Sequence, residues 1–249
     1  MKEVLYGRNA VRESLLAGRR RPLRLLLAEG IRETGTVREI LILARRCGIA
    51  VARLGRGELR GLGDVRHQGV GLETSPFPFC QLKDIVDLAQ SRGEPPLLLL
   101  LDLLQDPQNA GSLLRTAEAV GVHGAVLQRR RAVGITPGVV NASAGAVEHV
   151  LVAQVTNLVN MMNALKKDGV WIGGLEAVDG ASSYLSADLS GPLALVVGSE
   201  GQGMRRLVRE KCDFLLRLPM HGDVTSLNAA VAGSIVLYEV LRQREAVQR

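Results

Sequence analysis

The chain has few aromatic residues, which make up 3% of its 249 positions and include a single tryptophan, Trp171. Sheets of the RNA-recognition-motif type and OB-folds bind nucleic acid by stacking bases on aromatic side chains. This scarcity argues against both classes. The three cysteines, Cys47, Cys80 and Cys212, lie far apart in the sequence, so neither a disulfide framework nor a zinc site is indicated.

Long apolar runs are also missing. No stretch approaches the roughly 20 residues that a membrane-spanning helix needs, and the first residues lack the apolar segment of a signal peptide. From these absences we expect a cytoplasmic protein without a membrane partner. The four histidines show no ligand spacing to one another, so a metal site is not expected.

Positive charge is concentrated in the first third of the chain. Residues 1–75 contain 15 Lys or Arg and 8 Asp or Glu, whereas residues 76–249 contain 16 and 17. A basic module joined to a neutral body is typical of a part that binds a polyanion. The alternative is an arginine-rich surface that is simply solvated. The arginines of this region include Arg19, Arg20, Arg21, Arg45, Arg46, Arg53, Arg56, Arg60 and Arg66.

Alternating strand-like and helix-like patterns predict an α/β protein of two domains. Residues 1–75 are expected to form a small αβ domain, and the stretch 76–96, which is punctuated by proline and glycine, a linker. Residues 97–249 alternate apolar strands with helices, which predicts a mostly parallel sheet covered on both faces. The expected strands are 97–103, 124–127, 150–155, 170–175, 193–197 and 214–218, and the final helix is expected at 226–242.

Three loops of the second domain place polar residues directly after an apolar strand, where ligands bind in α/β sheets. The first contains Asn109, well suited to cap the helix after Pro107, and then Arg115. The second is Gly198–Gly203, with Glu200 between two glycines. Its spacing matches neither the dinucleotide GxGxxG motif nor a P-loop, so a Rossmann-type oxidoreductase is not indicated. The third contains Ser226 and Asn228.

These polar residues also have structural explanations. Arg115 could form an ion pair with Glu118 at i+3, and Glu200 could be a solvated turn carboxylate. Ser226 could be the N-cap of the last helix. Asn228 would then lie inside that helix, which is harder to explain because asparagine is a poor helix former.

Together the three segments, Asp106–Arg115, Gly198–Gly203 and Leu218–Asn228, resemble motifs 1, 2 and 3 of the SpoU (TrmH-type) branch of the SPOUT RNA methyltransferases. Within that branch the chain is most similar to the RlmB-type 23S rRNA guanosine-2′-O-methyltransferases. Residues 4–11, 67–69 and 143–146 resemble further family segments, so the likeness covers almost the whole chain.

This resemblance implies an L30e-like N-terminal domain that docks RNA and a SPOUT-type catalytic domain whose C-terminal segment forms a trefoil knot. It implies S-adenosylmethionine as cofactor, with no metal, and a homodimer whose active site lies at the subunit interface. The partner would be RNA, 23S rRNA in particular, and not DNA. The same chemistry on tRNA, and a non-catalytic RNA-binding role in ribosome assembly, are the alternatives.

The resemblance also assigns roles to residues. The catalytic cluster would be Asn109, Arg115, Glu200, Ser226 and Asn228, and the cofactor would be held near Gly198, Gly201, Leu218, Met220 and Leu227. Because arginine stays protonated, we expect Arg115 to hold a phosphate and stabilise negative charge. Glu200 or a phosphate oxygen would accept the proton of the ribose hydroxyl. The chain departs from the family pattern at Ala110, Ala229 and Ala230.

Overall fold

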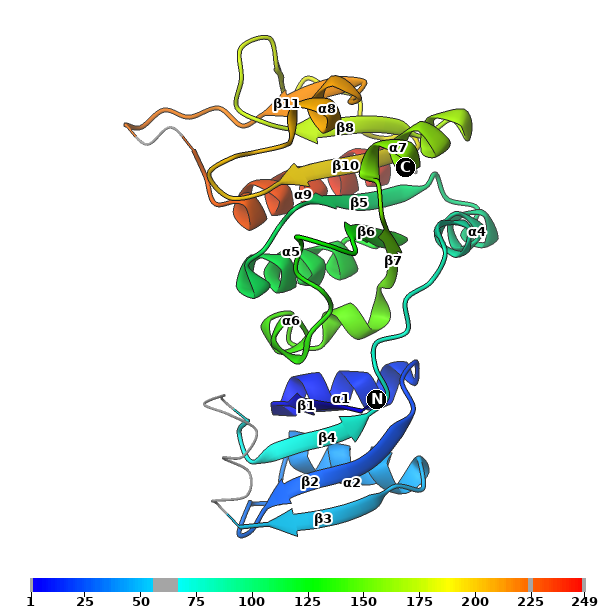
Figure 1. Cartoon of the computed structure of the whole chain (residues 1–249), viewed down its shortest axis with the longest axis vertical. Coiled ribbons are helices and arrows are strands. Elements are labelled where there is room, and N and C mark those ends of the chain that lie inside the picture. The colour runs from blue at the N-terminus through cyan, green and yellow to red at the C-terminus, as the bar shows by residue number, and fades with distance from the viewer. Residues whose placement is uncertain (1, 56–66, 224–225, 248–249) are drawn as a thin grey trace. The chain divides into compact units, whose positions relative to one another are not determined.

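The structure is a computed structural model that describes residues 2–55, 67–223 and 226–247 (Figure 1). Arg56, Arg60 and Arg66 of the basic region lie outside the described residues. The chain divides into two compact units. Unit 1 comprises Met1–Pro78 and Ile135–His149, and unit 2 comprises Phe79–Gly134 and Val150–Arg249.

Unit 1 is built on a four-stranded sheet of order β1-β4-β2-β3. Strands β2 and β3 are parallel, and β4 pairs antiparallel with both β1 and β2. Helices and strands are both present in this region, as expected for the small αβ domain of residues 1–75. The elements are β1 (Glu3–Tyr6), α1 (Arg8–Ala17), β2 (Pro22–Ala28), α2 (Thr36–Arg46), β3 (Ala50–Leu54), β4 (Val70–Thr74), α6 (Pro137–Ala142) and η1 (Ala146–His149).

Residues 135–149 belong to unit 1 although they lie in the middle of the predicted second domain. A buried ion pair holds them there, because Arg20 Nε donates to Glu148 Oε1 over 2.9 Å. At Gly145 the backbone has a φ of 89°, and a side chain would meet Glu13 Cβ at 2.6 Å. The domain boundaries expected from the sequence remain a prediction.

Unit 2 contains a parallel sheet of seven strands in the order β7-β6-β5-β10-β8-β11-β9, which confirms the predicted sheet type. Only the two-residue strand β9 had no sequence signal. The elements are α4 (Leu82–Arg92), β5 (Leu97–Asp102), α5 (Pro107–Ala119), β6 (Gly124–Gln128), β7 (Leu151–Val155), α7 (Leu158–Lys167), β8 (Trp171–Leu175), β9 (Ser182–Ser183), β10 (Leu193–Gly198), α8 (Arg206–Glu210), β11 (Phe214–Arg217) and α9 (Ala229–Val247).

Helices cover both faces of this sheet. On one face, buried residues of α4, α7 and α8 pack on alternate positions of β5, β10 and β8. On the other, α9 lies against β10 and packs beside α5 (Figure 1). Helices α9 and α5 lie close together, since a Cβ at Gly233 of α9 would meet Leu113 Cδ1 of α5 at 2.8 Å. None of the helices in the described ranges is both long and apolar enough to cross a membrane.

Candidate active site

A pocket of about 450 Å³ opens where three adjacent parallel strands, β10, β8 and β11, reach their carboxyl ends. Ligand sites in open α/β sheets lie at this edge, and the volume is within the usual range for small-molecule sites. All five residues expected to hold a cofactor line it, together with three of the five expected catalytic residues. These eight are Gly198, Gly201, Leu218, Met220, Leu227, Glu200, Ser226 and Asn228.

The glycines of the second loop are needed for its shape. Ser199 and Gly203 exchange two backbone hydrogen bonds of 3.0 and 3.1 Å, so the loop closes tightly on itself. A side chain on Gly198 would overlap the backbone of Gly203. Gly201 and Gly203 have φ values of 76° and 66°, in the left-handed region that glycine adopts without strain. The tight loop leaves Glu200 exposed beside the pocket.

Three polar side chains from the three loops form one hydrogen-bonded chain. Asn228 Nδ2 donates to Asn109 Oδ1 over 2.8 Å, and Asn109 Nδ2 donates to Glu200 Oε1 over 2.5 Å. The structure thus brings together residues that lie up to 119 positions apart in the sequence. Glu200 accepts through Oε1 from a neutral amide, and within the described residues no hydrogen bond uses its second carboxylate oxygen.

The helix caps differ from those expected. Asp106, and not Asn109, caps α5, since its carboxylate accepts from the backbone of Gln108 and Asn109 at 3.2 Å each. This leaves the Asn109 amide available to reach across to Glu200. Asparagine and aspartate are equally good caps, so residue type alone does not distinguish Asn109 from Asp106. Pro107 stands at the first helical position, which makes the preceding residue, Asp106, the cap.

Asn228 is the N-cap of α9, so the expected helix start at Ser226 was wrong by three residues. Asn228 Oδ1 accepts from Ala230 N at 2.9 Å and from Val231 N at 3.2 Å. Ser226 is exposed in the loop that precedes the helix. Because the cap needs the Asn228 oxygen, its amide nitrogen must face Asn109, and this fixes the direction of the whole hydrogen-bonded chain.

Of the two expected catalytic residues that do not line the pocket, Asn109 joins it through the hydrogen-bonded chain, whereas Arg115 does not. Its side chain is exposed on α5, and the lining of the pocket does not contain it. The ion pair with Glu118 considered from the sequence is not among those formed within the described ranges. Arg115 is therefore left with its charge directed outward.

Sequence reasoning missed the loop after β8, which contributes Glu176 to the pocket. Glu176 Oε1 accepts from Arg209 over 3.3 Å, whereas Glu176 Oε2 is buried and has no hydrogen-bond partner among the described residues. A buried carboxylate oxygen without a partner is unfavourable unless a ligand supplies a donor. The sequence did contain an indication of this loop. An apolar strand was expected at 170–175, and Glu176 follows it directly, as the polar residues of the other three loops follow their strands.

A buried polar network also joins the loops at this edge. Asp102 is fully buried and accepts from Arg205 N and Arg205 Nε, both at 2.8 Å. Gln128 donates to Asp102 Oδ1 over 3.1 Å and accepts from Leu103 N over 3.0 Å. The ends of β5 and β6 and the start of α8 are thereby held in one fixed arrangement.

Burial raises the pKa of the Cys212 thiol to about 12, so its reactive thiolate is scarce. Within the described ranges no group of three or more His, Cys, Asp or Glu side chains could hold a metal ion.

Comparison with known families gives two matches along the chain. The sequence profile of the SpoU rRNA Methylase family matches residues 96–238. A profile described as RNA 2′-O ribose methyltransferase substrate binding matches residues 4–80. The first match contains every element of the pocket, and the second covers the basic part of unit 1.

Related proteins and structures cover between two thirds and nearly all of the chain. YacO of Bacillus subtilis (strain 168), assigned to a TrmH family of tRNA/rRNA methyltransferases, is 44% identical over 98% of this chain and 97% of its own length. The SpoU methyltransferase AviRb of Streptomyces viridochromogenes, solved with AdoMet, has the same fold, with a TM-score of 0.81, 23% identity and coverage of 98% and 91%. A TrmH/SpoU tRNA modifying enzyme of A. aeolicus is 29% identical, with a TM-score of 0.56 and coverage of 67% and 85%.

Proposed function

Because the chain belongs to the SpoU rRNA methylase family, we propose that it methylates the ribose 2′-hydroxyl of an RNA nucleotide, a guanosine of 23S rRNA, with S-adenosylmethionine as methyl donor. The observation that carries the proposal is the Asn228–Asn109–Glu200 chain beside the glycine-bordered pocket. It places a carboxylate, one oxygen of which has no partner among the described residues, next to a site for a small molecule.

The pocket residues fit this cofactor. The apolar side chains of Leu218, Met220 and Leu227 would contact the flat adenine, and the tight backbone at Gly198 permits close approach. The unpartnered oxygen of Glu176 would accept from a hydroxyl or ammonium group, both of which S-adenosylmethionine carries. When bound, the cofactor supplies a methyl group activated by its positively charged sulfur.

The residues of the chain would prepare the nucleophile. A ribose hydroxyl attacks poorly while it keeps its proton, so a base in reach accelerates the reaction. Glu200 would accept that proton, and Asn109 would hold the carboxylate in place. The Asn228 amide in turn fixes Asn109, because its oxygen is committed to the first turn of α9.

Arg115 would hold a phosphate next to the target ribose and stabilise negative charge as the proton leaves. Its position outside the pocket is understandable if a second subunit completes the site. The exposed face of α9 supports such a homodimer, because Val231, Ile235 and Tyr238 form an apolar stripe at helical spacing on it, with exposed fractions of 48%, 36% and 54%. The homodimer and the trefoil knot remain predictions.

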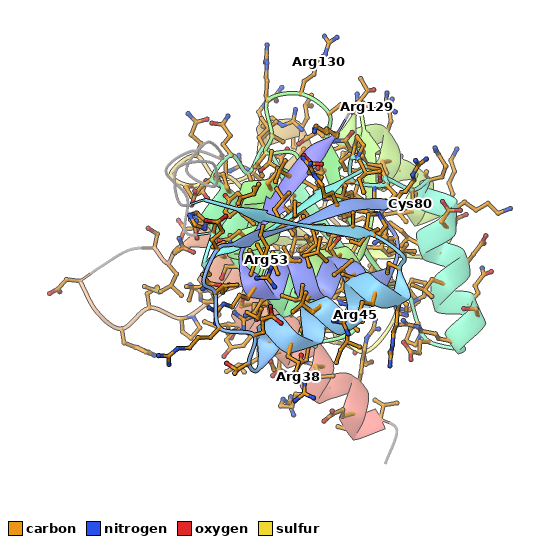
Figure 2. The ribbon with its side chains drawn as sticks, turned by 90° about the horizontal axis from the view of Figure 1, so that it is seen from below. Arg38, Arg45, Arg53, Cys80, Arg129 and Arg130 are labelled. Carbon is orange, nitrogen blue, oxygen red and sulfur yellow. The ribbon has the colours of Figure 1, made fainter. Side chains whose placement is uncertain are left out.

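Unit 1 would dock the RNA. Arg38, Arg45 and Arg46 are exposed on α2, and none of them forms an ion pair within the described residues. Figure 2 labels Arg38 and Arg45 together with Arg53 of β3. Unpaired guanidinium groups on one helix suit the phosphate backbone, and the substrate-binding profile covers this region.

The direct test is transfer of tritium from labelled S-adenosylmethionine to unmodified 23S rRNA and, separately, to bulk tRNA. We expect label in 2′-O-methylguanosine of the rRNA, and loss of that label with Arg115→Ala. Label only in tRNA would keep the enzyme class and change the substrate, an alternative that the tRNA-modifying relative of A. aeolicus favours. Tight RNA binding without label in either would instead support a non-catalytic role in ribosome assembly.

The variant Arg115→Lys refines the role of that residue. Lysine keeps the charge but lacks the planar fork that binds phosphate with two parallel hydrogen bonds. We expect reduced transfer with unchanged cofactor binding. Full activity of Arg115→Lys would contradict the bidentate role.

A further inference from the structure

Three consecutive arginines, Arg129, Arg130 and Arg131, leave the sheet of unit 2 directly after β6; they are here called the arginine loop. All three side chains are exposed, and those of Arg129 and Arg130 project away from the ribbon at the upper margin of Figure 2. None of them forms an ion pair within the described parts of the chain. The loop therefore gathers three like charges that no carboxylate of the described residues neutralises.

The position of the loop relates it to the pocket. Strand β6 is parallel to β5, and β5 is parallel to β10, so the arginine loop leaves the sheet at the same edge as the loops that carry Asn109 and Glu200. Neighbouring strands lie about 4.8 Å apart, so the end of β6 is on the order of 10 Å across the sheet from the end of β10. An RNA strand whose ribose reached Glu200 would pass within reach of this loop.

The backbone of the loop is held although its side chains are not. Arg129 N donates to Val155 O over 3.0 Å, and Gln105 Nε2 donates to Arg131 O over 3.2 Å. Arg131 has a φ of 61°, a left-handed conformation that a residue with a Cβ adopts only when its surroundings impose it. A loop fixed in this way presents its charges without the ordering that a flexible segment would need on binding.

The buried network beneath the loop fixes it relative to the site. Gln128, the residue before Arg129, bonds Asp102, and Asp102 bonds Arg205, which directly follows the Gly198–Met204 segment. The same Gln128 accepts from Leu103 in the loop that leads to Asn109. Movement of the arginine loop against either motif loop would break these hydrogen bonds, of which the one between Gln128 and Asp102 is buried.

From these observations we infer that the arginine loop binds a phosphate group of the substrate RNA close to the nucleotide being methylated. Guanidinium groups recognise phosphate through paired, charge-assisted hydrogen bonds, and an anion would relieve the repulsion among the three charges. This inference deepens the proposed function and rests on it for the identity of the polyanion. It gives unit 2, whose sequence shows no excess of positive charge, its own contact with the RNA backbone.

The test compares the double variant Arg129→Ala/Arg130→Ala with the matched control Arg206→Ala/Lys211→Ala. The control removes two exposed cations from the same unit, at and just after α8. Binding of an unmodified 23S rRNA transcript is measured by filter binding at several salt concentrations. Binding of S-adenosylmethionine, measured by calorimetry, shows whether each variant keeps the fold of its pocket.

We expect the arginine-loop variant to bind this RNA about 10-fold more weakly near 0.15 M salt. The slope of the logarithm of its association constant against the logarithm of the salt concentration should be shallower by about 1. This is the change expected for roughly one lost phosphate contact. The control should keep the wild-type slope, and both variants should bind S-adenosylmethionine like the wild type. The variant Arg129→Lys/Arg130→Lys should recover most of the slope, because the slope counts charges.

An unchanged slope and affinity in the arginine-loop variant would overturn the inference even if the enzyme methylates RNA normally. A reduced slope in a protein that never transfers a methyl group would uphold the phosphate contact and reject the proposed activity. A wild-type protein that binds neither the rRNA transcript nor tRNA would overturn both, and the loop would then be a candidate contact for an acidic protein.

Discussion

Two carboxylates of this protein are each held by a side-chain donor, with opposite consequences. In unit 1, Glu148 is fully buried and pairs with Arg20, whose other contacts are also internal. In unit 2, Glu200 is exposed beside a pocket and bonds one neutral amide. The first carboxylate has all its partners within the protein, whereas the second keeps an oxygen for a ligand.

The same contrast separates the arginines. Within unit 1, Arg20, Arg24, Arg12 and Arg53 all pair with carboxylates, so these four cations are not left unpaired for a polyanion. In unit 2, the arginine loop carries unpaired charge in a region of balanced composition. Net charge along the sequence is thus a weaker guide to a polyanion site than the pairing of each cation in the fold.

The largest predicted effect comes from removing the buried carboxylate, Glu148. Burial raises the pKa of Glu148 against the opposing attraction of Arg20, so this ion pair is costly to bury. Glu148→Ala would leave Arg20 buried with only Glu3 as a charged partner, and we expect a loss of about 3 kcal/mol in the free energy of unfolding, measured with urea. The double variant Arg20→Met/Glu148→Leu should lie close to wild type. A Glu148→Ala protein of unchanged stability would contradict this account.

The second prediction separates the capping and orienting roles of Asn228. Asn228→Asp keeps an oxygen for the first turn of α9 but cannot donate to Asn109, so its melting temperature should match wild type while methyl transfer falls roughly 10- to 100-fold. Asn228→Ala loses both roles and should also lose about 1 kcal/mol of stability. Melting curves measure the capping role of Asn228, and single-turnover rates measure its orienting role. Equal rates for Asn228→Asp and wild type would show that the hydrogen-bonded chain is not needed for the reaction.

The third prediction concerns the unpartnered oxygen of Glu176. Glu176→Gln removes the charge that a donor on the cofactor would meet, and we expect binding of S-adenosylmethionine to weaken about 10-fold in calorimetry. Arg209→Ala removes the partner on the other oxygen and leaves the carboxylate in place, so it should affect binding much less. If the two variants bind equally, Glu176 does not contact the cofactor.

The smallest effect comes from a polar group whose contacts are all internal. His123 accepts from Leu97 N at Nδ1 over 3.0 Å, so Nε2 carries the proton that faces Glu94 over 3.0 Å. Burial lowers the pKa of His123 below its usual 6.5, although Glu94 opposes the shift. Below about pH 6.5 the unfolded chain therefore binds a proton that the folded chain excludes, and stability falls as the pH falls.

We expect the melting temperature of the wild type to drop between pH 7.5 and pH 5.5 by slightly more than that of His123→Gln. The difference should lie within the roughly 2–4 °C that 1 kcal/mol produces in a protein of this size. Glutamine can accept from Leu97 and donate to Glu94 without titrating, which makes it the matched control. If the melting temperature of His123→Gln dropped more than that of the wild type, the lowered pKa assigned to His123 would be contradicted.

Much of the fold and part of the site could be predicted from local sequence patterns. The apolar runs predicted six strands of the parallel sheet, and β5 (Leu97–Asp102) ends within one residue of the expected 97–103, because burial imposes a local periodicity on each element. Loops that follow parallel strands share one edge of the sheet, so the three motif loops could be expected to lie together, whereas the choice of Gly198, Leu218 and Leu227 within them came from the family resemblance.

The tertiary structure alone decided which polar groups have partners. Asp106 and Asn228 cap their helices, which frees Asn109 to reach Glu200, and Glu176 enters the pocket from a loop that carried no motif. Arg20 finds Glu148 at a separation of 128 residues, whereas the arginine loop finds no carboxylate within the described residues. Periodicity and turn residues are properties of neighbours in sequence, but hydrogen bonds and ion pairs depend on distances that only the folded chain sets.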